Sequence, residues 1–108
     1  MSRKPIEIFI DADACPVKDE VYKVAQRYGL KTWVVSNAFM MIPASPLIGR
    51  VIVEAGPDVA DDWIAKHVQT GDIAVTADIP LAERVLKAGG QALAPNGRAF
   101  TENSIGAA

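Results

Sequence analysis

The chain has 108 residues, half of them hydrophobic, and a formal net charge of −2. This is the length of one ordinary domain with enough apolar residues for a core, and the charge excludes the broad basic surface of a protein that grips long duplex DNA. The one cysteine cannot form an internal disulfide or a thiolate metal site and suits a reducing cytoplasm, and the first apolar run is too short for a signal peptide or a membrane span.

Strands and helices are predicted to alternate along the chain. In order, the hydrophobic pattern predicts a strand at Ile6–Ile10, a helix at about Pro16–Tyr28, a strand at Thr32–Val35, a loop over residues 37–49, a strand at Val51–Val53, a helix from near Asp58 that ends at Gly71, a strand at Ile73–Thr76, a helix at Pro80–Ala88 and a strand at Gln91–Ala94. Such alternation implies right-handed crossovers and a mainly parallel sheet flanked by helices, so the predicted fold class is α/β.

Acidic and amide side chains follow the predicted strands. In chain order they are Asp11 and Asp13, then Asn37, then Asp58, Asp61 and Asp62, then Asp78. The carboxyl ends of parallel strands share one edge of the sheet, where α/β proteins bind their ligands. Six of the eight aspartates are therefore expected at that edge, with Asn37 beside them as a candidate substrate contact.

Two roles compete for these aspartates. Asp13, Asp58 and Asp78 each stand where a carboxylate can cap a helix. Three caps do not account for six carboxylates, however, and carboxylates packed together repel one another unless a cation joins them. A site built only from carboxylate oxygens suits a hard ion, so the predicted cofactor is Mg²⁺ or Mn²⁺.

Four sequence motifs resemble those of a known family: "IDADACPV", "GPDVADDWI", "GDIAVTADIPLAERVLKAGG" and "LAPNGRAFT". From Phe9 to about Thr101 the chain resembles the YaiI/YqxD family of uncharacterised bacterial proteins, which in turn resembles the PIN-like and NYN nucleases. The resemblance implies a PIN-like three-layer fold with an acidic metal centre. It also implies at least one further helix, so residues 1–108 are expected to form a single PIN-like domain truncated at its C-terminus.

The resemblance assigns roles to particular residues. Asp11 matches the aspartate that ends the first strand, Thr76-Ala77-Asp78 matches a late S/T-x-D phrase, and Gly56-Pro57-Asp58-Val59 resembles a G-x-D-V phrase. Pro80 stands where those nucleases have a second acid, for which Asp13 is expected to compensate. The predicted catalytic residues are Asp11, Asp13, Asp62 and Asp78, the predicted metal ligands are Asp11, Asp13, Asp58, Asp61, Asp62 and Asp78, and the predicted substrate contacts are Asn37 and Thr76.

The implied activity is metal-dependent hydrolysis of RNA or another single-stranded nucleic acid. Two alternatives stay open: a regulatory domain that binds a cation or nucleotide without turnover, and a phosphatase of the haloacid dehalogenase type with Asp11 as nucleophile. The second also needs a lysine at a later strand end, and the sequence has none there. The apolar loop over residues 38–48 either packs on the sheet edge, forms a homodimer contact, or presents Phe39 for base stacking.

Overall fold

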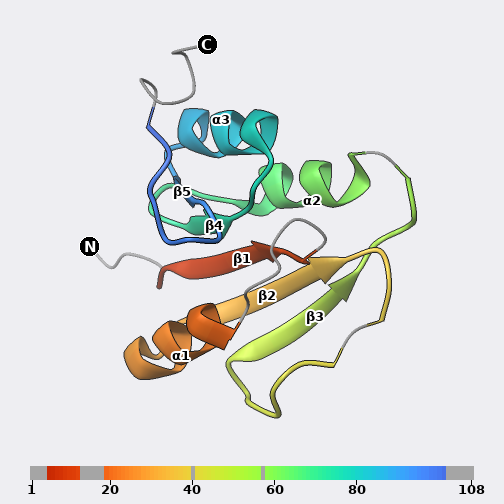
Figure 1. Ribbon diagram of the computed structural model, residues 1–108, viewed down its shortest axis with the longest axis vertical. Helices are drawn as coiled ribbons and strands as arrows, with labels where there is room; N and C mark the ends of the chain where they lie inside the picture. The colour runs from red at the N-terminus through yellow and green to blue at the C-terminus, as the bar shows by residue number, and fades with distance from the viewer. Residues whose placement is uncertain (1–4, 13–18, 40, 57, 102–108) are drawn as a thin grey trace.

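The fold is built on a five-stranded parallel sheet. The structure, a computed structural model, describes residues 5–12, 19–39, 41–56 and 58–101. Its elements are β1 (Glu7–Asp11), α1 (Asp19–Tyr28), β2 (Lys31–Ser36), β3 (Ile48–Ile52), α2 (Val59–His67), β4 (Ile73–Val75), α3 (Ile79–Lys87) and β5 (Gln91–Leu93). The strand order is β3-β2-β1-β4-β5, and every neighbouring pair is parallel. The predicted α/β class is confirmed, with β1 at the centre of the sheet (Figure 1).

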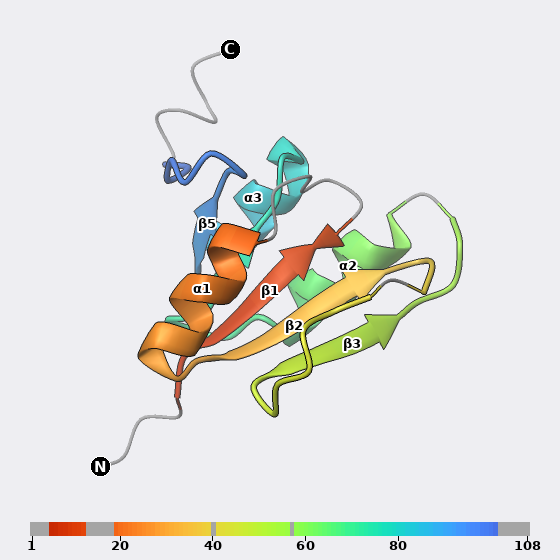
Figure 2. The ribbon, with the colours of Figure 1, turned by 60° about the horizontal axis from the view of Figure 1, so that its bottom comes forward.

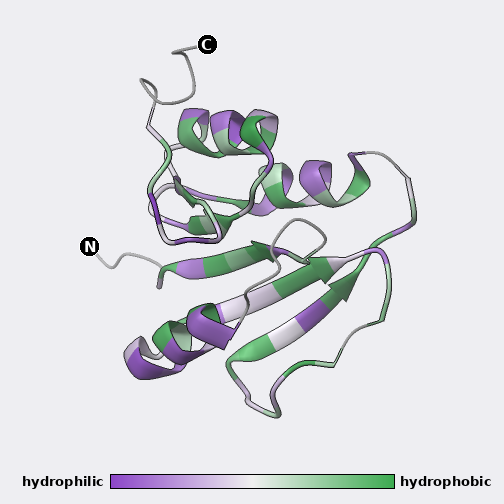
Figure 3. Ribbon diagram, viewed as in Figure 1, coloured by the Kyte–Doolittle hydropathy of each residue, from purple (hydrophilic) through white to green (hydrophobic). Residues whose placement is uncertain are grey.

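Helices cover both faces of the sheet and so make three layers. On one face Ile10 and Val34 pack with Tyr22 of α1, and on the other Phe9 packs with residues of α2 and α3 that include Ile64. Figure 2 shows α1 in front of the sheet and the other two helices behind it, and Figure 3 shows hydrophobic residues along the strands. Because successive side chains of a strand point to opposite faces, both cores draw on the same strands.

The third strand begins earlier than the sequence predicts. Ile48 and Gly49 were expected in a loop and the strand was expected to start at Val51, but β3 starts at Ile48, and Gly49 pairs with Trp33 of β2. A side chain at Gly49 would place its Cβ 2.9 Å from Cζ3 of Trp33. This glycine is therefore a strand residue that makes room for an indole ring, although glycine ordinarily indicates a loop. The predicted start of the first helix, before Asp19, lies outside the described residues.

Asp72 links β1 to the segment after α2 at the amino ends of the strands. Its Oδ1 accepts a hydrogen bond from the Glu7 amide at 3.0 Å, and its Oδ2 accepts one from the Gln69 amide at 2.9 Å. The residue is 1% exposed. One buried carboxylate thus joins the start of β1 to the segment between α2 and β4. None of the described helices is long and apolar enough to cross a membrane.

Replacing Asp72 by alanine is expected to lower the free energy of unfolding by about 2 to 4 kcal/mol, because two partly buried amides lose a charged acceptor. Asp72→Asn keeps one acceptor oxygen and should cost less. Urea denaturation of both variants measures the difference. A loss below about 0.5 kcal/mol in the alanine variant, the range of ordinary surface changes, would contradict this role for Asp72.

Candidate acidic site at the carboxyl ends of the strands

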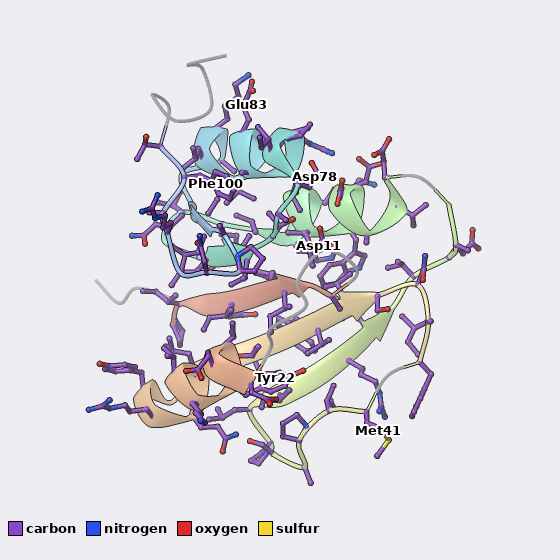
Figure 4. The ribbon with its side chains drawn as sticks, viewed as in Figure 1. Asp11, Tyr22, Met41, Asp78, Glu83 and Phe100 are labelled. Carbon is purple, nitrogen blue, oxygen red and sulfur yellow. The ribbon has the colours of Figure 1, made fainter. Side chains whose placement is uncertain are left out.

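A cavity of about 260 Å³ lies where β1 and β2 end. Its lining combines four carboxylates with one side-chain amide and two small residues: Asp11, Asn37, Gly56, Asp58, Ala60, Asp61 and Asp78. The aspartates come from the end of β1, the start of α2 and the turn before α3. Figure 4 shows Asp11 and Asp78 close to each other at this edge. The structure thus brings together five of the side chains that the sequence places after its strands.

A threonine hydroxyl joins Asp11 to Asp78. Thr76 Oγ1 donates to Asp11 Oδ2 at 2.7 Å and accepts from the Asp78 amide at 3.0 Å. The contact follows from the topology, because β1 and β4 are neighbours and Thr76 comes directly after β4. Thr76 is 0% exposed, so its hydroxyl is out of reach of a substrate. Its observed role is to position two aspartates, which differs from the substrate contact predicted for it.

Asp78 serves as a helix cap and as a site residue at once. Its Oδ1 accepts a hydrogen bond from the Leu81 amide at 3.0 Å at the start of α3, where Pro80 occupies the first turn. The same side chain also lines the acidic cavity together with Asp61. The capping role and the site role therefore do not exclude each other at this position.

Asp58 occupies the N-cap position of α2 without capping it through its side chain. Its backbone is left-handed, with φ 67°. Among the described residues, it is the only one other than glycine with a positive φ. Aspartate tolerates this conformation better than most residues, at some cost in free energy. The side chain lines the acidic cavity instead. The alternative that Asp58 is a side-chain cap is wrong.

Asp61 carries the clearest electrostatic signature of crowding. Its pKa is raised from 3.8 to about 7, first by burial, then by the hydrogen bond with Asp78, then by repulsion from Asp11, Asp78 and Asp58. Each of these causes disfavours the charged carboxylate. Near neutral pH this cluster therefore holds a proton that an isolated aspartate would have released.

Asp62 does not join this group. Its Oδ1 lies 2.7 Å from Nη1 of Arg84 on α3, and both side chains are about half exposed. Its side chain is directed toward Arg84 and is not part of the cavity lining, whereas that of Asp61 is. Of the predicted metal ligands in this segment, Asp58 and Asp61 line the cavity and Asp62 does not. Asp13 lies outside the described residues.

The cavity has ligand types that suit a hard cation, but its carboxylates are not arranged around one. Four carboxylates and an amide are the oxygen ligands that Mg²⁺ and Mn²⁺ prefer. Among the residues that the structure describes, however, no three His, Cys, Asp or Glu side chains stand ready to hold a metal ion. The side chains fit a hard cation chemically, and binding one would require the carboxylates to close around it.

The sequence comparisons identify the family of the chain. Residues 9–108 match the sequence profile described as "Uncharacterized BCR, YaiI/YqxD family". This chain belongs to the YaiI/YqxD family. It is 65% identical over 101 residues to a UPF0178 protein of Caulobacter vibrioides (strain NA1000 / CB15N), a match that covers 94% of this chain and 66% of the relative. The resemblance to the YaiI/YqxD family seen in the sequence is confirmed.

Other relatives are also named UPF0178 proteins. A UPF0178 protein of Rhodopseudomonas palustris (strain BisB5) is 62% identical over 94% of this chain and 62% of its own length. One from Azorhizobium caulinodans is 60% identical over 96% of this chain and 65% of its own length. The chain thus spans about two thirds of the length of the curated relatives it matches. No solved structure matches it.

The pKa of Asp61 predicts how stability changes with pH. Between pH 3.8 and about 7 the folded chain keeps a proton that the unfolded chain releases, so this group's contribution to stability falls as the pH rises through that window. Asp61→Asn removes the decline and should be more stable than the wild type at pH 8. Urea denaturation at pH 5 and pH 8 measures both effects.

Asp19→Asn is the matched control, since Asp19 is exposed in the first turn of α1, away from the cavity lining. That variant should keep the pH response of the wild type. An Asp61→Asn variant with an unaltered pH response would show that Asp61 is not crowded by the other carboxylates.

Proposed function

We propose that this domain is a metal-dependent phosphodiesterase that cleaves RNA or another single-stranded nucleic acid with Mg²⁺ or Mn²⁺. The observation that carries the proposal is the convergence of Asp11, Asp58, Asp61 and Asp78 on one cavity at the carboxyl ends of the strands. Negative charge concentrated in this way favours a divalent cation, and such cations serve phosphoryl chemistry.

In this proposal the four carboxylates hold the cation. Asp11 and Asp78 are the best positioned pair, because the Thr76 hydroxyl bonds to the side chain of one and the amide of the other. Asp58 and Asp61 approach from the start of α2. Asp13, which follows β1 in the sequence, keeps its predicted role as a further ligand. A bound cation would offset the negative charge of a phosphodiester and make its phosphorus easier to attack.

Asn37 is the proposed substrate contact. It lines the same cavity from the end of β2, and it is exposed, so a ligand can reach its amide group. An amide both donates and accepts hydrogen bonds, and its donor group suits a phosphate oxygen. The neutral side chain adds no negative charge to repel an anionic substrate. Asn37 therefore offers a place for the nucleic acid backbone beside the carboxylates.

The proposal predicts that Mg²⁺ or Mn²⁺ stabilises the folded chain and that cleavage depends on it. Stabilisation by a ligand at about 100 times its Kd is roughly 2.7 kcal/mol. Asp11→Asn and Asp78→Asn should abolish this response and lower the rate by about 100-fold or more, the effect expected of several kcal/mol of lost charge stabilisation. Asparagine caps a helix almost as well as aspartate, so Asp78→Asn removes charge while keeping α3 capped.

The measurements are melting temperatures with and without the cation, and cleavage of a mixed-sequence RNA oligonucleotide. Asp19→Asn serves as the control. Cation-induced stabilisation without cleavage of RNA or single-stranded DNA would instead establish a non-catalytic cation-binding domain. A wild type that responds to neither cation would contradict the site itself.

A comparison of neighbouring residues tests the predicted catalytic role of Asp62. The geometry favours Asp61, which lines the cavity, over Asp62, which pairs with Arg84. Asp61→Asn should weaken cation binding, whereas Asp62→Asn should alter stability by less than about 1 kcal/mol, the usual worth of an exposed ion pair. Titration of both variants with Mn²⁺ decides the matter. An equal loss of cation affinity in the two variants would show that Asp62 also takes part in the site.

A further inference from the structure

A second cavity, of about 350 Å³, lies beside α1 and is almost entirely apolar. Its lining comes from α1, from Leu30 just before β2, from the three strands β1, β4 and β5, and from the turn after β5, and it includes Val24, Ile73 and Leu93. We call this cavity the α1 groove. Of the described residues that line it, only Glu20 and Asn96 have polar side chains. It shares no residue with the acidic cavity.

Within the part of the chain that the structure describes, the α1 groove is a part of the sheet face that no helix covers. α2 and α3 both pack on the opposite face, with Phe9, Ala74 and Ala92. On this face α1 packs over β1 and β2, and no other described helix lies beside β4 and β5 (Figure 2). Parallel sheets are normally covered on both faces. Val24 is 49% exposed here, although its helix is strongly amphipathic.

The relatives are long enough to contain a segment that could cover this surface. Because 101 matched residues are 66% of the Caulobacter vibrioides relative, that protein has about 153 residues, of which about 52 lie outside the match. A helix of 10 residues is about 15 Å long, so those residues are ample for a helix that fills the groove. An apolar groove with two polar side chains suits the apolar face of an amphipathic helix.

We propose that the α1 groove is the docking site for the part of the family's chain that lies outside the region shared with this one. The occupant is a helix whose apolar face packs on Val24, Ile73 and Leu93. Glu20 and Asn96 flank it with polar groups, and Glu20 favours a basic residue at the edge of the occupant. The helix completes the three-layer structure over β4 and β5.

The test adds the unmatched residues of the Caulobacter vibrioides relative, as a separate labelled peptide, to this chain. Fluorescence anisotropy should show saturable binding, and hydrogen exchange should slow at residues 20–24 and 93–97. Val24→Asp places a charge in the groove and should weaken binding at least 10-fold. Val24→Ser, a milder change at the same half-exposed position, should weaken it less.

Ile52→Asp is the matched control, since Ile52 is 56% exposed on the edge strand β3 and does not line the groove. It should bind the peptide as the wild type does. Absence of binding, or equal weakening by Val24→Asp and Ile52→Asp, would overturn the proposal. So would sedimentation showing that the wild type dimerises and that Val24→Asp abolishes the dimer, because the occupant would then be a second copy.

Discussion

The organisation of the carboxyl edge depends on one hydroxyl group that lies between two aspartates. Thr76 is buried, and its Oγ1 donates to the Asp11 carboxylate while accepting from the Asp78 amide. Asp11 is itself only 4% exposed, and a buried carboxylate is costly unless it is hydrogen-bonded. Thr76 thus makes it possible for the central strand to end in a buried acid. The same hydroxyl fixes the turn from which α3 begins, since the Asp78 amide bonds to it.

The two ends of the sheet show how environment decides the behaviour of an aspartate. At the amino ends, both oxygens of Asp72 accept hydrogen bonds from backbone amides, so its buried side chain has partners for each oxygen. At the carboxyl ends, Asp61 faces three other carboxylates, and its pKa is raised to about 7. The first arrangement satisfies a charge and holds the fold together. The second leaves charge that a proton or a cation must offset, which is the character of a binding site.

Much of the fold follows from the sequence because its signals are local. Hydrophobic periodicity predicts the alternation of strands and helices, and alternation implies a parallel sheet whose acidic edge can be named in advance. The start of β3 was missed because a glycine is needed at position 49 only to make room for the ring of Trp33, which lies on another strand. A contact between residues distant in sequence leaves no local pattern to read.

The site was predicted in part for the same reason. Placement after a strand was enough to find Asp11, Asn37 and Asp78. It could not separate Asp61 from Asp62, because that choice depends on how α2 packs, with Asp61 toward the cavity and Asp62 toward Arg84 of α3. Thr76 was recognised within a motif, but its role depends on the pairing of β4 with β1.

The strained and crowded residues lie together, and this supports a functional reading of the acidic edge. The left-handed backbone at Asp58 and the shared charge of Asp61 both cost stability, and both belong to one cavity. Costs of this kind persist where they serve a function. A purely structural end to these strands would need only a cap such as Asp78 gives α3, and Asp58 and Asp61 would then bring cost without benefit. A ligand that needs concentrated negative charge accounts for all four carboxylates at once.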